Sequence, residues 1–181
     1  MIQPLAYVNP GAKLADNVVI EPFVTIHKNV EIGEGTWIGS NVTIMEGARI
    51  GKNCKIFPGA VISAIPQDLK FNGEDTTTEI GDNTTIRECV TINRGTSSKG
   101  KTIIGKNCLL MAYCHIAHDT ILGDNVIIGN GSQIAGEVTI ADFAILSGLV
   151  AVHQFVNIGP HVMISGGSLV RKDVPPYTKA A

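Results

Sequence analysis

The sequence has few aromatic residues, no long apolar run and no excess of charge of one sign. Aromatic side chains make up 5% of the 181 residues, and 14 Lys and Arg stand against 16 Asp and Glu, a formal net charge of −2. This balance argues against a nucleic-acid surface or an anionic-membrane anchor. No stretch is long enough for a membrane-spanning helix, and the start MIQPLAYVNP lacks the regions of a signal peptide. We therefore expect one cytoplasmic domain without an integral membrane segment.

Cysteine is also scarce. Cys54, Cys89, Cys108 and Cys114 form neither a CxxC pair nor the dense pattern of a disulfide scaffold, which is typical of a reducing compartment. Glycine, in contrast, is abundant, with 20 residues. Many glycines and few aromatics indicate tight turns around a small aliphatic core, so an internal repeat is the first pattern to test.

A six-residue period runs through almost the whole chain. Every sixth residue from Ile2 to Val170 is Ile, Leu or Val, except at positions 68, 74 and 98. Two residues before most of these positions the side chain is small, so both face one side of a short strand. Three residues after them Gly or Asn is frequent, and these residues tolerate positive φ; examples are Gly11, Asn29 and Gly35. Each hexad is therefore predicted to be a short strand followed by a sharp corner.

Three hexads close one triangular coil, and successive coils would pair as parallel strands about 4.8 Å apart. The predicted fold is all-β, a parallel β-helix of hexapeptide repeats spanning residues 1–174. An amphipathic helix is excluded because its period would be near 3.6 residues. Cys54, Cys108 and Cys114 fall on the small inward position and are predicted to be buried core residues.

Two segments leave the repeat, Ser63–Glu79 and Asn93–Thr102. Both are polar, and we expect them to form external loops on the solenoid. Solenoids commonly carry function where insertions leave the coil. A solvated loop without function is the alternative, above all for the second segment.

Three of the five histidines converge on one predicted edge. Alternation points His115 outward and places His118 at the following corner, so both should lie at the surface. Gly136 follows His118 by one coil and Gln154 by two, so the three should form a column, with His153 beside it. A main-chain N–H left open at Gly136 suits a developing oxyanion, and a histidine suits proton transfer near neutral pH.

The motifs IPQDLKFNGE, IRECVTINRGT, CHIAHDTILG, IAGEVTI, AVHQF and DVPPY resemble those of the UDP-N-acetylglucosamine 3-O-acyltransferase family of the hexapeptide-repeat transferases. The resemblance covers essentially the whole chain. It implies a left-handed solenoid, a homotrimer with clefts between subunits, and no cofactor or metal. It also implies transfer of a (R)-3-hydroxyacyl chain from acyl carrier protein to the sugar 3-hydroxyl, the first step of lipid A biosynthesis.

Carried onto this sequence, the resemblance makes His118 the general base, Asp119 its supporting carboxylate and the Gly136 N–H the oxyanion donor. It assigns substrate contacts to Gln67, Asp68, Lys70, Asn93, His115, His153, Gln154 and Gly166. At Gly166, which in the family gauges acyl length, a glycine leaves room for a long chain.

Two positions depart from the family pattern, since Asn93 and Glu137 stand where histidine is common. Residues 175–181 would begin a segment that in the family leads into a C-terminal helical domain, absent from this sequence. If 181 residues are the whole molecule, we expect weaker substrate binding.

Two other functions remain open from the residues. Some hexapeptide β-helices resemble zinc-dependent carbonic anhydrases with three histidine ligands, but HIAH has no stacked third histidine here. The other alternative is a non-catalytic solenoid that acts as a scaffold.

Overall fold

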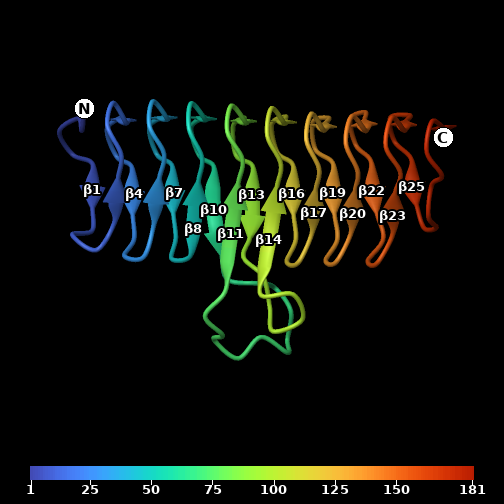
Figure 1. The fold of residues 1–181 in the computed structure, drawn as a ribbon, viewed down its shortest axis with the longest axis horizontal. Coiled ribbons are helices and arrows are strands. Elements are labelled where there is room, and N and C mark those ends of the chain that lie inside the picture. Colours follow the sequence, from blue (N-terminus) through green and yellow to red (C-terminus); the bar gives the residue numbers. More distant parts are fainter.

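Each hexad folds into a short strand and a corner, as the period predicts. The computed structural model describes residues 1–181 and contains strands, turns and no helix. The strands wind into a three-sided parallel solenoid whose termini lie at opposite ends of its long axis (Figure 1). The predicted three-hexad coil is therefore confirmed.

The three sides are parallel sheets in which neighbouring strands belong to successive coils. The first sheet contains β1 (Tyr7–Val8), β4 (Thr25–Ile26), β7 (Thr43–Ile44), β10 (Val61–Ala64), β13 (Thr91–Asn93), β16 (His115–Ile116), β19 (Gln133–Ile134), β22 (Ala151–Val152) and β25 (Leu169–Val170). The second contains β2 (Lys13–Leu14), β5 (Glu31–Ile32), β8 (Ala48–Ile50), β11 (Thr77–Ile80), β14 (Lys101–Ile104), β17 (Ile121–Leu122), β20 (Thr139–Ile140) and β23 (Asn157–Ile158). The third contains β3 (Val19–Ile20), β6 (Trp37–Ile38), β9 (Lys55–Ile56), β12 (Thr85–Ile86), β15 (Leu109–Leu110), β18 (Ile127–Ile128), β21 (Ile145–Leu146), β24 (Met163–Ile164) and β26 (Lys179–Ala180).

The core is a continuous column of inward-facing aliphatic side chains and small residues. All four cysteines are free, and Cys54, Cys108 and Cys114 are buried in this column, which confirms the interpretation of the small inward position. Burial raises the pKa of all three thiols, that of Cys108 to about 11. These cysteines therefore act as small apolar core residues.

Most corner residues have positive φ, and they include more residue types than the Gly and Asn that the sequence predicts. Asn and Gly corners such as Asn29 and Gly35 adopt positive φ, whereas Gly11 does not. Bulky residues, among them Tyr113 and Phe155, also take φ between 60° and 75° in the same repeat position. The coil geometry therefore imposes the corner conformation even on side chains that disfavour it.

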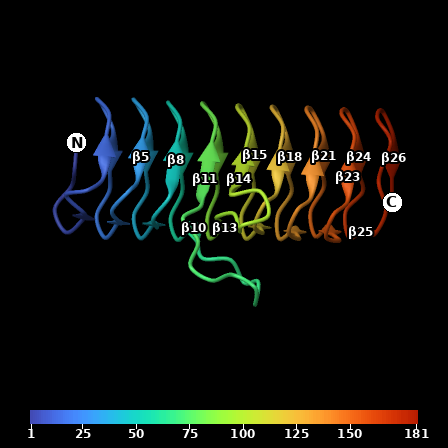
Figure 2. The ribbon, with the colours of Figure 1, turned by 60° about the horizontal axis from the view of Figure 1, so that its bottom comes forward.

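The two insertions leave the solenoid at one edge, where Figure 1 shows them projecting side by side. The first inserted loop comprises residues 65–76 and the second comprises residues 94–100. Val61 pairs with Thr91, and Thr91 pairs in turn with His115, so the first loop adds two hexads to its coil and the second adds one. The strands of each sheet consequently continue in order on both sides of the loops, and the rotated view shows the coils stacked without a break (Figure 2).

The solenoid extends beyond residue 174, where we placed its end. Lys179 and Ala180 in β26 pair with Met163 and Ile164 of β24. Tyr177 forms another corner with φ of 58°. Residues 175–180 therefore continue the last coil.

Candidate active site

A polar cleft lies across β13, β16 and β19 of the first sheet. Its volume is about 500 Å³, and its lining includes Asn93, His115, His118 and Gly136 together with Gln67 from the first inserted loop. Strand alternation turns His115 outward, and His118 and Gly136 lie at the corners that follow β16 and β19. These four residues come from three successive coils and Gln67 from a loop, and all five were assigned from the sequence to substrate binding or catalysis.

His118 is paired with the carboxylate that follows it. Its Nδ1 lies 2.8 Å from Asp119 Oδ2. A carboxylate accepts hydrogen bonds, so Nδ1 carries the proton in the neutral imidazole and the lone pair resides on Nε2. The Nε2 atom lies 3.9 Å from Asp68 Oδ2 of the first inserted loop. This arrangement leaves a proton acceptor directed away from Asp119.

Gly136 occupies the next coil along the same corner. Glu137 N donates to His118 O at 2.9 Å, and Phe155 N donates to Gly136 O, which confirms the stacking of His118, Gly136 and Gln154. The N–H of Gly136 donates to no group of the protein. A Cβ at this position would come within 2.6 Å of the His118 ring. Only glycine therefore admits both the imidazole and an open donor at this place.

The predicted surface position of His118 is wrong. His118 is 8% exposed and Asp119 is fully buried, because the two inserted loops cover this corner. Thr96 and Lys99 of the second loop donate hydrogen bonds to the Asp119 carboxylate. The sequence places His118 correctly on the outer side of the coil but does not show what covers it.

A second hollow of about 470 Å³ adjoins the cleft. It is lined by Gln67, Asp68, Leu69, Lys70, His118 and Gln154, and shares Gln67 and His118 with the first. The first inserted loop supplies four of these residues. The N–H of Lys70 donates to Asp68 Oδ1 at 2.9 Å, which holds the loop conformation there. The predicted contacts from the loop and from the solenoid thus surround one imidazole.

His115 is held on the cleft floor by Thr91, whose Oγ1 lies 2.7 Å from His115 Nδ1. Burial, and to a lesser extent the charge of His118, lowers the pKa of His115. The side chain is therefore favoured in its neutral form, which suits hydrogen bonding to an uncharged polar ligand.

Of four further positions singled out in the sequence, only Asn93 lines the cleft. Asn93 is buried, its Nδ2 donates to Ile65 O, and its Oδ1 has no hydrogen-bond partner. His153 is exposed, does not line either hollow, and its Nδ1 lies 3.1 Å from Gln154 O. Glu137 is half-buried and makes no ion pair. Gly166 lies beside Gly148 at another corner, away from both hollows of this chain.

A metal site of the carbonic anhydrase kind has no support in the side-chain geometry. No group of three His, Cys, Asp or Glu side chains could hold a metal ion.

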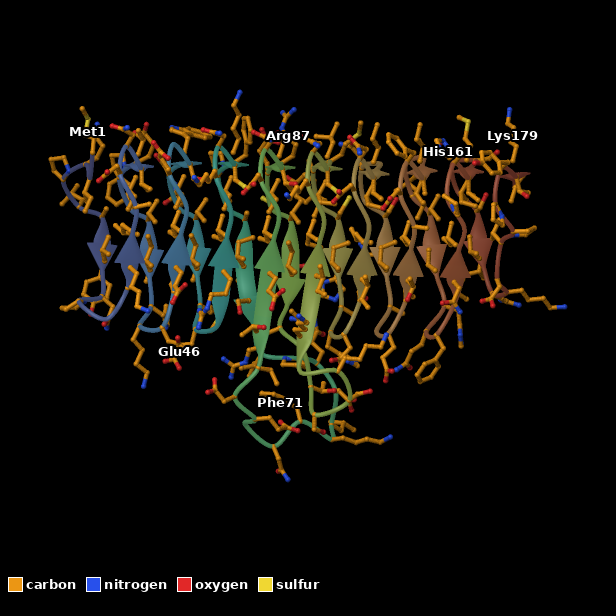
Figure 3. All side chains as sticks on the ribbon, in the orientation of Figure 1. Met1, Glu46, Phe71, Arg87, His161 and Lys179 are labelled. Carbon is orange, nitrogen blue, oxygen red and sulfur yellow. The ribbon has the colours of Figure 1, made fainter.

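His161 does not belong to the cleft, since Figure 3 shows it at the edge opposite Phe71 of the first inserted loop. It stacks between Phe143 and Tyr177, with ring centroids 4.9 and 5.1 Å apart.

Sequence reasoning missed several lining and supporting residues. Tyr113, Thr91 and Gln133 line the cleft. Gln133 follows His115 by one regular coil, so the period could have identified it, whereas the second loop adds a hexad between Thr91 and His115 and hides their pairing. Thr96 and Lys99 reach Asp119 through a loop conformation, for which the period provides no signal.

The chain matches the family described as bacterial transferase hexapeptide (six repeats) over residues 29–64 and 101–136. Fold and cleft together thus define a hexapeptide-repeat transferase.

The relatives are more specific. An acyl-[acyl-carrier-protein]–UDP-N-acetylglucosamine O-acyltransferase of Sulfurovum sp. (strain NBC37-1) is 55% identical over 99% of this chain and 69% of its own length. The crystal structure of a UDP-N-acetylglucosamine acyltransferase from Bacteroides fragilis 9343 superimposes with a TM-score of 0.98 at 56% identity, over 99% of this chain and 70% of that one. The enzyme of Francisella novicida also reaches 0.98, at 47% identity, over 100% and 67%. The chain belongs to the acyl-[acyl-carrier-protein]–UDP-N-acetylglucosamine O-acyltransferase family, and its solenoid is the expected left-handed parallel β-helix.

Proposed function

We propose that this protein transfers a (R)-3-hydroxyacyl chain from acyl carrier protein to the 3-hydroxyl of UDP-N-acetylglucosamine, the first step of lipid A biosynthesis. Family membership supports the reaction class and both substrates. The observation that carries the mechanism is the pairing of His118 Nδ1 with buried Asp119, while its Nε2 faces the cleft beside the open N–H of Gly136.

In this mechanism His118 Nε2 removes the proton of the sugar 3-hydroxyl as its oxygen attacks the thioester carbonyl. The carbonyl oxygen becomes an oxyanion, which the N–H of Gly136 stabilises. The C–S bond then breaks, and the imidazolium returns the proton to the departing thiol of the carrier. Asp119 keeps Nδ1 protonated and balances the imidazolium charge. The reaction needs no cofactor, because the thioester supplies the activated acyl group.

Substrate binding is proposed for the polar residues around the base. Gln67, Asp68 and Lys70 of the first inserted loop and Gln154 would contact the nucleotide sugar, and they surround His118 in the second hollow. Asn93 and His115 would contact the sugar from the cleft floor, and His153 would contribute from beside Gln154. Gly166 would limit acyl length only weakly, because it carries no side chain.

A homotrimer is proposed as the working form, with the cleft completed by a neighbouring subunit. An outward-facing apolar row on the third sheet supports this, because exposed contiguous apolar surface marks protein contacts. The row consists of Leu109, Ile127, Ile145 and Met163, which are paired from coil to coil.

The structure contains no helix able to span a bilayer. A cytoplasmic location is proposed from the four free cysteines.

The test is a turnover assay with UDP-N-acetylglucosamine and a series of 3-hydroxyacyl carrier proteins of different acyl length, with the product identified by mass spectrometry. We expect a 3-O-acylated sugar nucleotide, and none from the 3-deoxy analogue. Absence of product at every length, or equal acylation of the 3-deoxy analogue, would overturn the proposal.

A further inference from the structure

The second inserted loop makes its strongest contacts with the Asp119 carboxylate. Thr96 N lies 3.0 Å from Oδ1 and 3.1 Å from Oδ2, and Thr96 Oγ1 lies 2.6 Å from Oδ2. Lys99 N lies 3.2 Å from Oδ1. With His118 Nδ1, the carboxylate accepts from four donors, and three of these belong to the loop.

These donors are needed because Asp119 is fully buried. A buried carboxylate is costly unless hydrogen bonds replace its water, and donors to both oxygens also prevent rotation about the bond to Cβ. His118 alone would satisfy one oxygen and leave the carboxylate free to turn. The orientation of the imidazole therefore depends on the loop through Asp119.

The loop itself is held firmly. Gly95 N donates to Thr77 O at 3.1 Å, and Thr76 Oγ1 donates to Gly95 O at 2.7 Å, which joins the second loop to the end of the first. Within the loop, Gly100 N donates to Thr96 O at 2.8 Å, and Ser98 N donates to Thr96 Oγ1. A Cβ on Gly95 would come within 2.2 Å of Lys101 N, so the main chain approaches too closely there for any other residue.

We propose that Thr96 is a positioning residue of the acyl transfer, acting on the base His118 through Asp119. The Thr96 hydroxyl and His118 Nδ1 both donate to Asp119 Oδ2. The hydrogen bond from Thr96 fixes the orientation of the carboxylate. It also weakens the hold of that oxygen on the imidazole proton. The proposal rests on the proposed function, since it assigns a partner to the base of that reaction.

The test compares Thr96→Val, which removes the hydroxyl at similar volume, with Thr96→Ser, which keeps it. Thr84→Val is the matched control, because the buried Thr84 hydroxyl likewise donates once and accepts once, but at an inward position of the solenoid. We expect Thr96→Val to lower kcat about tenfold or more, the size of losing one hydrogen bond to a charged group, with KM for UDP-N-acetylglucosamine within about twofold. Thr96→Ser and Thr84→Val should both stay within about threefold of the parent enzyme.

The action through Asp119 is tested in an Asp119→Ala background. There, Thr96→Val should cause no further loss of kcat, because the carboxylate it orients is gone. An undiminished kcat of Thr96→Val in an active enzyme, or an equal loss in the Asp119→Ala background, would overturn the positioning role and leave the proposed function standing.

A readout independent of turnover separates the two proposals. Exchange of the His118 Cε1 hydrogen for solvent deuterium, followed by mass spectrometry across a pH series, reports the ionisation of that imidazole. In Thr96→Val the Asp119 oxygen that faces His118 loses its hydroxyl donor and keeps only the weaker main-chain one, so the exchange profile should move to higher pH, while Thr84→Val should leave it unchanged. If the parent enzyme shows no turnover, the proposed function fails, and an unmoved profile in Thr96→Val would then also overturn the contact-based role of Thr96.

Discussion

The imidazole of His118 packs against the main chain of Gly136 so closely that a methyl group at residue 136 would lie 2.6 Å from both Cε1 and Nε2. The two residues stand one coil apart in the same corner column. The base and the oxyanion donor of the proposed mechanism are therefore neighbours, and the space between them does not admit even a methyl group.

Gly136→Ala should lower kcat by about 100-fold, because the methyl group displaces the imidazole and covers the open N–H. Residue 136 does not adopt positive φ, so alanine fits its backbone and the fold should persist. Gly11→Ala is the control, since its Cβ would meet no atom closer than 3.3 Å and φ is also not positive. Steady-state kinetics with thermal unfolding measures both effects. Full activity of Gly136→Ala would refute the packing.

His115 should make the fold less stable as pH falls. Burial first, and the charge of His118 second, lowers its pKa in the folded protein, so below the unfolded value of about 6.5 the unfolded chain binds more protons. The stability contribution is complete above that pH and is lost as pH falls toward the folded pKa.

Urea unfolding of the parent protein and of His115→Gln at pH 5 to 7.5 isolates this contribution. The variant should show the shallower fall in the free energy of unfolding. Parallel curves for the two proteins would contradict it.

Thiol labelling should distinguish the four cysteines. Burial raises the pKa of Cys108 to about 11 and also raises the pKa of Cys54 and Cys114, so few thiolates form near pH 8 and reagents cannot reach them. Cys89 is partly exposed at a corner. Iodoacetamide on the folded protein, followed by peptide mass spectrometry, should modify Cys89 alone, and all four after denaturation. Labelling of Cys108 in the folded protein at the rate of Cys89 would refute this account of the core.

The solenoid could be predicted from the sequence because its core repeats every six residues. The three interruptions of the period, at positions 68, 74 and 98, all lie in the inserted loops. The column of His118, Gly136 and Gln154 followed from the same arithmetic. The residue type at a corner predicted its backbone conformation less well, since Gly11 lacks the expected positive φ and Tyr113 adopts it. A corner conformation is set by its neighbouring coils more than by its own residue.

The burial of His118 and Asp119 could not be predicted in this way. It depends on loops that follow no period and whose conformation is held by contacts distant in sequence, such as Thr96 with Asp119 and Thr76 with Gly95. Family resemblance could assign roles to residues of the cleft. It did not indicate that the second inserted loop supports the carboxylate.

His118→Ala provides the most direct test of His118 as the base of an acyl transfer. With UDP-N-acetylglucosamine and the best 3-hydroxyacyl carrier protein, we expect its kcat to fall by about 1,000-fold, within the range for losing general-base catalysis. Binding of UDP-N-acetylglucosamine, measured by calorimetry, should change by less than about tenfold. Turnover equal to that of the parent enzyme would contradict the assignment of His118.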